Sequence, residues 1–230
     1  TRTPYGNLAR VANGFFDAIF FDMDGLTINS EPQWLEAEIE LTAPFGYSWT
    51  LQDQAACLGG PLTKVGQYMA DKTGGAKSGP DFHSEIVELM ASKVSKRAEF
   101  MPGAKELLTE LRDAGIALAL VSASPRVIVD AALGHVQPLP FKATISSDDV
   151  TQTKPNPEGY LKAATLLGVN IENCLILEDS LTGVKAAQAS GAKVIAVPHL
   201  VHIESNSQTK VIKSLKDLNF DTLKELFATW

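Results

Sequence analysis

Two aspartates follow an apolar run near the start of the chain. The run Ala18–Phe21 is entirely apolar, and Asp22 and Asp24 come directly after it with one residue between them. Residues two apart at the end of a strand project to the same side, so both carboxylates would face one point. One carboxylate can attack phosphorus and form an aspartyl-phosphate, while a second moves a proton. The pair therefore predicts phosphoryl chemistry if other reactive groups converge there.

Polar residues also follow other apolar runs. They are Ser122, which Ala123 follows, Lys154 in the loop after the third run, and Glu178 with Asp179. Taken singly, they could be a turn, a surface lysine and a helix cap. However, ligands of open parallel sheets bind outside the carboxyl ends of the strands. Four such groups at strand ends are better explained by one site than by four coincidences.

The residue types at these strand ends suit a metal and a phosphate. Clustered carboxylates repel one another and need a cation, and oxygen ligands beside a phosphate favour Mg²⁺. A hydroxyl, backbone amides and a lysine can hold a phosphate dianion. A calcium loop of the EF-hand type does not fit, because Leu26 and Gln33 stand where that loop needs ligands. We therefore predict a Mg²⁺ site with a phosphorylated substrate.

The elements that must position these residues form an α/β pattern. Short apolar runs predict strands buried on both faces, at Ala18–Phe21, Ile116–Val121, Ala143–Ile145, Cys174–Leu177 and Val194–Val197. Helical periodicity lies between them, around residues 104–114, 158–167 and 181–189. This alternation predicts a Rossmann-like, doubly wound parallel sheet.

The segment from residue 30 to 99 lacks any predicted strand. It holds three helical stretches, Pro32–Leu41, Leu62–Ala70 and Asp81–Val94. We therefore expect an all-helical cap domain at 30–99, inserted into an α/β core made of 15–29 and 100–230.

The composition narrows the function classes. The chain has 230 residues and a net charge of −7, which argues against a broad surface for nucleic acid or anionic lipid. Cys57 and Cys174 show no metal-type spacing and fit a reduced compartment. No apolar run approaches membrane-spanning length, and the first residues lack the apolar core of a signal peptide. We expect a cytoplasmic monomer with no membrane or nucleic-acid partner.

Taken together, the sequence resembles the haloacid dehalogenase-like hydrolase superfamily, in the branch of β-phosphoglucomutase and sugar-phosphate phosphatases. The motifs that carry the resemblance occur in order, as Asp22-Met23-Asp24-Gly25, Val121-Ser122-Ala123-Ser124, Lys154-Pro155, and Leu177-Glu178-Asp179-Ser180 followed by Gly183. Each motif alone is weak, but the ordered set is specific.

The resemblance implies roles for these residues. Asp22 would be the nucleophile, and Asp24 the general acid and then the base. Ser122, the Ala123 amide and Lys154 would bind phosphate. Mg²⁺ would be held by the Asp22 carboxylate, the Asp24 backbone carbonyl, Asp179 and Glu178, the last directly or through water. The helical insertion would close over the substrate.

The resemblance leaves three functions open. We expect a Mg²⁺-dependent phosphatase of small phosphorylated metabolites, with a phosphomutase as the alternative and a catalytically silent binding protein as the third possibility. In β-phosphoglucomutase-like proteins a gating histidine and a phosphate-gripping arginine stand where this chain has Trp34 and Thr63, with Lys64 beside the latter. Candidates to line the leaving-group pocket are Trp34, Tyr47, Trp49, Leu58–Leu62 and Lys64, although Trp49 is better explained as core.

Overall fold

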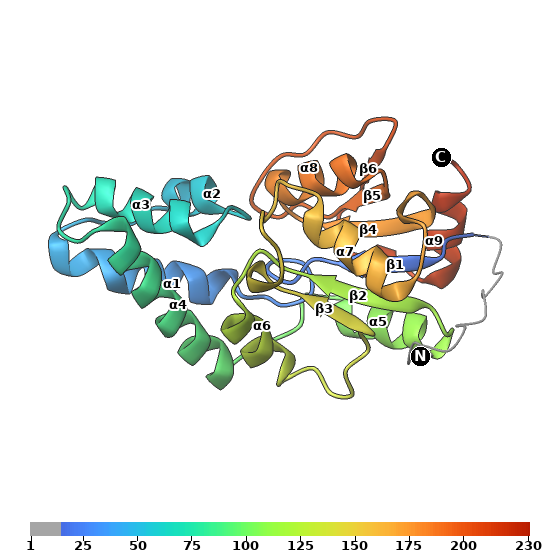
Figure 1. The fold of residues 1–230 in the computed structure, drawn as a ribbon, viewed down its shortest axis with the longest axis horizontal. Helices are drawn as coiled ribbons and strands as arrows, with labels where there is room; N and C mark the ends of the chain where they lie inside the picture. Colours follow the sequence, from blue (N-terminus) through green and yellow to red (C-terminus); the bar gives the residue numbers. More distant parts are fainter. Residues whose placement is uncertain (1–14) are drawn as a thin grey trace, which may run out of the picture.

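The computed structural model describes residues 15–230, and a six-stranded sheet forms its centre (Figure 1). The strands run in the order β3-β2-β1-β4-β5-β6, and every neighbouring pair is parallel. They are β1 (Ala18–Phe21), β2 (Ala117–Val121), β3 (Ala143–Ile145), β4 (Cys174–Glu178), β5 (Lys193–Ala196) and β6 (Thr209–Val211). The order reverses between β1 and β4, which is the topological switch point of a doubly wound sheet.

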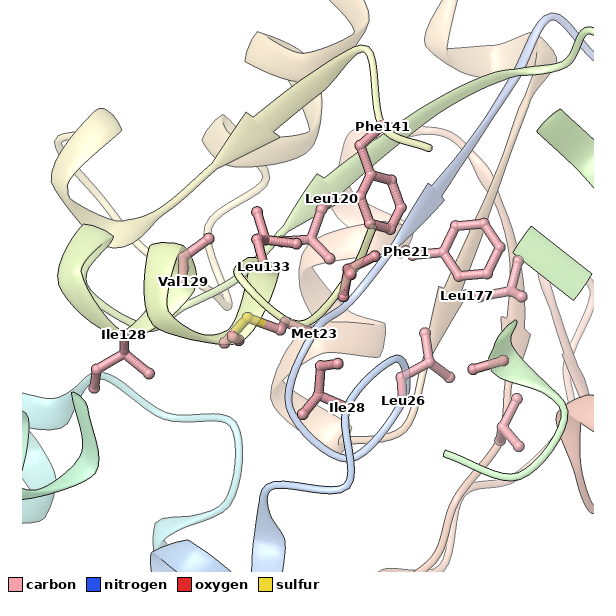
Figure 2. Close-up of a cluster of buried hydrophobic side chains, with 14 of the residues drawn as sticks. Phe21, Met23, Leu26, Ile28, Leu120, Ile128, Val129, Leu133, Phe141 and Leu177 are labelled. Carbon is pink, nitrogen blue, oxygen red and sulfur yellow. The ribbon is translucent and has the colours of Figure 1, made fainter. Parts of the chain in front are cut away.

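Alternate residues of β1 enter different hydrophobic clusters on the two faces of the sheet. Ile19 and Phe21 join the cluster that contains side chains of α5 (Ala104–Asp113), α6 (Arg126–Leu133) and α9 (Phe220–Phe227). Figure 2 shows part of this cluster, with Phe21 lying near Phe141. Ala18 and Phe20 join the other cluster, with α7 (Glu158–Leu167) and α8 (Leu181–Ser190). This burial on both faces is why the central strands are continuous apolar runs.

Four helices stand apart from the sheet and form what we call the helical lobe (Figure 1). They are α1 (Glu31–Thr42), α2 (Leu51–Cys57), α3 (Leu62–Lys72) and α4 (Gly79–Lys96). The chain enters and leaves the lobe at one place, because Ile28 pairs with Phe100 in an isolated β-bridge. The lobe is therefore an insertion between β1 and α5.

The structure confirms the predicted fold class and adds elements that the pattern did not reveal. The five predicted strands are present to within one residue at either end, but β6, α2, α6 and α9 were not predicted. β6 has only three residues at the sheet edge. α6, with the sequence RVIVDAAL, is rich in β-branched residues, which weakens its helical signal. No helix within residues 15–230 has the length and apolar character needed to cross a bilayer.

Because α3 packs closely against α4 at Gly66, we predict that Gly66→Ala destabilises the protein. A Cβ at this position would lie 2.4 Å from the Gly79 carbonyl oxygen and 2.9 Å from the His83 amide nitrogen. Helix propensity alone would make Gly66→Ala stabilising by about 1 kcal/mol. We expect the reverse, because overpacking against backbone costs about 1–3 kcal/mol and lowers the melting temperature by several degrees.

Thermal unfolding of Gly66→Ala beside Thr63→Ala checks this. Thr63 is exposed on the same helix, so its substitution gains propensity without a new contact. A Gly66→Ala protein as stable as the Thr63→Ala protein would contradict the close contact of α3 and α4.

Candidate active site

The loop after β1 turns tightly and places both aspartates at the sheet edge. The Thr27 hydroxyl donates to the Asp22 carbonyl oxygen at 2.6 Å, and the Gly25 amide donates to the Ile28 carbonyl oxygen at 2.9 Å. Gly25 has φ of +78°, and any Cβ there would lie 2.3 Å from Oδ2 of Asp179. A glycine is required here both by the left-handed backbone and by the approach of that carboxylate.

Asp22, Glu178 and Asp179 form a buried carboxylate cluster. β1 and β4 are neighbours, with Phe21 in register with Leu177, so the residues that follow them meet. One carboxylate oxygen from each of the three acids lies within 4.8 Å of the others. Glu178 fits only because residue 183 is glycine, whose Cβ would otherwise lie 2.0 Å from the Glu178 carboxyl carbon.

Lys154 supplies the positive charge inside this cluster. Its ammonium group donates to Oδ1 of Asp22 and, at 2.6 Å, to Oε1 of Glu178, and the side chain is 5% exposed. The Tyr160 hydroxyl donates to the same Glu178 oxygen at 2.5 Å. Burial lowers the pKa of Lys154, but the charges of Asp22 and Glu178 outweigh burial and raise this pKa above its usual range. Lys154 is therefore held as a cation.

The donor set fits a hard divalent cation. Burial, with the charge of Glu178, raises the pKa of Asp22, and burial, with the charge of Asp22, raises that of Asp179. Both shifts mean that one lysine does not offset three buried carboxylates. All the available ligand atoms are oxygens, which suits Mg²⁺.

Asp24 is oriented by donors from three segments of the chain. Its Oδ1 accepts from the Ser30 hydroxyl at 2.6 Å and from the Trp34 indole nitrogen at 3.1 Å. Its Oδ2 accepts from the hydroxyls of Ser124 at 2.8 Å and Ser122 at 3.3 Å. The carboxylate group is therefore fixed by the β1 loop, by α1 and by the loop after β2.

The predicted site residues lie together at one cavity between the sheet edge and the helical lobe. Asp22, Asp24, Ala123, Lys154 and Asp179 line it directly. Ser122 and Glu178 do not line the cavity but hydrogen-bond to residues that do.

The candidate pocket residues of the lobe divide into two groups. Trp34, Leu58, Gly59, Gly60 and Leu62 line the cavity. Tyr47, Trp49, Pro61 and Lys64 do not, and Trp49 belongs to the hydrophobic core as expected.

Sequence reasoning missed several residues of the site. They are Ser30, Ser124 and Tyr160, which bond to the reactive carboxylates, and Glu31, Glu38 and Gln54, which line the lobe side of the cavity. Ser124 belongs to the recognised motif Val121-Ser122-Ala123-Ser124, although no role was assigned to it, and Ser30 stands shortly after the motif Asp22-Met23-Asp24-Gly25. Tyr160 and Glu38 lie within helices, where nothing in their spacing marks them.

The lobe side of the cavity is acidic. Glu38 is 3% exposed, and one of its carboxylate oxygens has no hydrogen-bond partner. Burial raises the pKa of Glu38 to about 8, and the charges of Glu31 and Asp53 add to this shift, while the Trp49 indole opposes it. Burial, together with the charge of Asp24, raises the pKa of Glu31 to about 7.

The raised pKa of Glu38 predicts how stability depends on pH. The pKa is about 8 in the folded protein against 4.5 for an ordinary glutamate, so ionisation favours the unfolded state. The free energy of unfolding therefore falls as the pH rises from about 4.5 to about 8, by about 1.4 kcal/mol for each unit of pKa shift. Glu38→Gln keeps the shape and removes the ionisation, so its melting temperature should exceed that of the native protein increasingly across this window.

Melting curves at pH 5 and pH 8.5 measure this difference. Glu36→Gln on the same helix is the matched control, since the Glu36 side chain is 58% exposed. A stability difference between Glu38→Gln and the native protein that stays constant with pH would contradict the burial of an ionisable Glu38.

Comparison with known proteins agrees with the fold and the motifs. The family described as haloacid dehalogenase-like hydrolase matches residues 19–197. Protein SUPPRESSOR OF QUENCHING 1, chloroplastic, of Arabidopsis thaliana is 33% identical over 200 residues, which are 85% of this chain but only 19% of that protein. Hexitol phosphatase B of Escherichia coli (strain K12) is 29% identical over 214 residues, covering 92% of this chain and 94% of that one.

A solved structure extends the likeness to three dimensions. The crystal structure of CbbY from Rhodobacter sphaeroides in complex with phosphate has 25% identity and a TM-score of 0.76, covering 90% of this chain and 99% of that chain. The family match covers residues 19–197, which is most of the chain, and the fold agrees with it. The chain belongs to the haloacid dehalogenase-like hydrolase family.

Proposed function

We propose that this chain is a Mg²⁺-dependent phosphatase that hydrolyses small phosphorylated metabolites, sugar phosphates among them, through phospho-Asp22. The observation that carries the proposal is the meeting of Asp22 and Asp24 with Lys154 at a single cavity, beside the buried acids Glu178 and Asp179. A cavity with two carboxylates of different surroundings suits a nucleophile and a separate proton carrier.

The first half-reaction would use both aspartates of the β1 loop. A carboxylate oxygen of Asp22 attacks phosphorus, and the bond from phosphorus to the leaving oxygen breaks. Asp24, in its protonated form, gives its proton to that oxygen. In the second half-reaction water attacks phosphorus, Asp24 takes the proton from the water, and the bond between phosphorus and Asp22 breaks. The donors from Ser30, Trp34, Ser122 and Ser124 keep Asp24 in place for both transfers.

Charge compensation would come from Lys154 and the metal site. Lys154 touches Asp22, so its ammonium group can also meet the phosphate that Asp22 attacks. Ser122 and the Ala123 amide would supply further donors to phosphate. Mg²⁺ would be held by the carboxylates of Asp22, Glu178 and Asp179 with the Asp24 backbone carbonyl. Its positive charge would offset the negative charge of the phosphate.

We further propose that the helical lobe acts as a cap domain, with bounds 30–99, on a core of 15–29 and 100–230. A Cβ on Gly59 would lie 2.4 Å from the Ser180 hydroxyl oxygen, so the lobe contacts the core beside the metal-binding segment. Such a cap excludes bulk water and shapes the leaving-group pocket. Monomeric state, cytoplasmic location and the absence of a nucleic-acid partner remain predictions.

Several observations support phosphate monoesters of small molecules as substrates. Relatives are named as phosphatases, and Hexitol phosphatase B covers almost the whole chain. The alternative, a phosphomutase, needs a cation in the lobe to hold a second phosphate. Lys64, the candidate for this role, does not line the cavity. The direct test is hydrolysis of p-nitrophenyl phosphate and of a panel of phosphorylated metabolites in the presence of Mg²⁺.

Asp22→Asn should abolish turnover and leave the fold intact. The amide is a poor nucleophile, while its carbonyl oxygen can still accept from Lys154, and the change relieves repulsion among buried acids. Phosphate release should fall by at least about 10³-fold, and the melting temperature should be equal or higher. Asp17→Asn, an exposed change just before β1, is the matched control. Near-native turnover by Asp22→Asn would rule Asp22 out as the nucleophile.

Asp179→Asn should weaken Mg²⁺ binding. Removing one of three buried carboxylates takes away a charged oxygen ligand, and the loss should appear in calorimetric titration of the protein with Mg²⁺. Chelation of divalent ions should stop hydrolysis by the native protein. Titration curves that are the same for the native protein and the variant, or activity that persists in excess chelator, would refute the site.

A further inference from the structure

Tyr160 is a fully buried side chain that takes no part in the chemistry proposed above. It lies in α7 and is 0% exposed. Within residues 15–230 its hydroxyl makes one hydrogen bond, which it donates to Oε1 of Glu178 at 2.5 Å. A phenylalanine would fill the same space without the cost of burying a hydroxyl. The partner of this hydroxyl is therefore informative, and it is a member of the carboxylate cluster.

The ring of Tyr160 is held by two neighbours. It is stacked with Phe20, at a centroid distance of 6.4 Å and an interplanar angle of 12°. The Lys154 ammonium group lies 5.1 Å from the centroid of the same ring. Both contacts belong to the ring and not to its oxygen. The hydroxyl is thus presented to Glu178 by a side chain that packing holds in place.

The two carboxylate oxygens of Glu178 differ in the donors that they accept from. Oε1 accepts from the Tyr160 hydroxyl at 2.5 Å and from the Lys154 ammonium group at 2.6 Å. Two donors fill the lone pairs of one carboxylate oxygen. Among the described residues, Oε2 accepts only from the backbone amide of Asp179, at the longer distance of 3.2 Å. Oε2 is therefore the oxygen of Glu178 that remains for a cation.

We propose that Tyr160 is a positioning residue: together with Lys154 it keeps Oε1 of Glu178 from ligating a metal, so that Glu178 gives one oxygen and the site favours Mg²⁺ over Ca²⁺. The inference rests on the Mg²⁺-dependent function proposed above and concerns how that ion is selected. Lys154 also donates to Oδ1 of Asp22, so a second acid of the cluster has one of its oxygens engaged.

The two cations differ in what they need from a carboxylate. Ca²⁺ takes about six to eight oxygens and often both oxygens of one carboxylate, whereas Mg²⁺ demands an octahedron of about six and keeps several waters in it. A glutamate restricted to one oxygen therefore costs Ca²⁺ a ligand and costs Mg²⁺ none. Removal of the Tyr160 hydroxyl would free Oε1 and relax this restriction.

A purely structural role of the hydroxyl would have a different consequence. Loss of a buried hydrogen bond would lower the stability of the protein and weaken the binding of both cations to a similar extent. A role in restricting Glu178 changes the two affinities unequally. The ratio of the Ca²⁺ Kd to the Mg²⁺ Kd therefore separates the two roles.

Calorimetric titration with Mg²⁺ and with Ca²⁺ measures this ratio in three proteins, the native chain, Tyr160→Phe and the control Tyr68→Phe. Tyr160→Phe removes one oxygen and keeps the ring that contacts Phe20 and Lys154. Tyr68→Phe removes a bond of the same kind from the lobe, where the Tyr68 hydroxyl donates to Oδ1 of Asp53 at 2.8 Å. Tyr68 does not line the active-site cavity.

The native protein should bind Mg²⁺ more tightly than Ca²⁺. In Tyr160→Phe the ratio of the Ca²⁺ Kd to the Mg²⁺ Kd should fall by about tenfold, because loss of a hydrogen bond to a ligating carboxylate typically changes metal affinity by about 10–100-fold. In Tyr68→Phe the ratio should stay within about twofold of the native value, since the site is distant. Ca²⁺ should also inhibit the Mg²⁺-dependent hydrolysis of p-nitrophenyl phosphate at about tenfold lower concentration in Tyr160→Phe than in the native protein.

Three results would overturn the role of Tyr160. The first is a native protein that binds Ca²⁺ at least as tightly as Mg²⁺, which is measured without any variant. The second is a ratio in Tyr160→Phe equal to the native ratio, whatever the melting temperature of the variant. The third is a Tyr160→Phe protein that does not fold with either ion present, because the hydroxyl would then serve the fold.

Failure of the proposed function would be recognised separately. A native protein that binds neither ion refutes the metal site, and the role of Tyr160 is refuted with it. A native protein that binds Mg²⁺ selectively but hydrolyses no phosphate ester refutes the phosphatase proposal alone. The titrations of Tyr160→Phe and Tyr68→Phe then still decide the role of Tyr160.

Discussion

The pairing of Lys154 with Asp22 and Glu178 is the interaction on which the rest of the site depends. Buried charges are tolerated only when they are paired and hydrogen-bonded. Lys154 comes from the loop after β3, while its partners follow β1 and β4, so the pair holds three strand ends together. Tyr160 adds α7 to the same network through Glu178. Among the described residues, Lys154 is the only cationic side chain paired with the carboxylate cluster, so its removal would leave the cluster without a positive charge.

The sheet order makes this network possible. Asp22 and Glu178 are far apart in the sequence, but β1 and β4 are neighbours at the switch point, and their carboxyl ends open into one crevice. Gly25 and Gly183 then allow the acids to approach backbone at distances that no side chain would permit. The positions of the reactive groups are thus decided by topology, and their separation is decided by two glycines.

This division explains what could be predicted from the sequence. The strands were predictable because burial on both faces leaves unbroken apolar runs, as in β1 and β4. Asp22, Ser122 and Glu178 were found because each stands at the end of such a run, and Lys154 was found because it lies in the loop that follows β3. β6 has only three residues, one buried and two half-buried, which is too short to leave a pattern, and its place is decided by pairing with β5. Tyr160 and Glu38 could not be found, because their roles arise from contacts between distant segments and not from spacing along a helix.

The helical lobe and the reactive carboxylates are not independent parts. Trp34 belongs to α1, yet its indole donates to Asp24, and Ser30 directly before α1 donates to the same oxygen. A displacement of α1 from the sheet edge would remove Trp34 from Asp24 and at the same time withdraw Glu31 and Glu38 from the cavity. One helix therefore carries both a contact that orients the β1-loop carboxylate and two acids that line the same cavity. Because the two features share α1, the shape of the leaving-group pocket and the orientation of Asp24 change together.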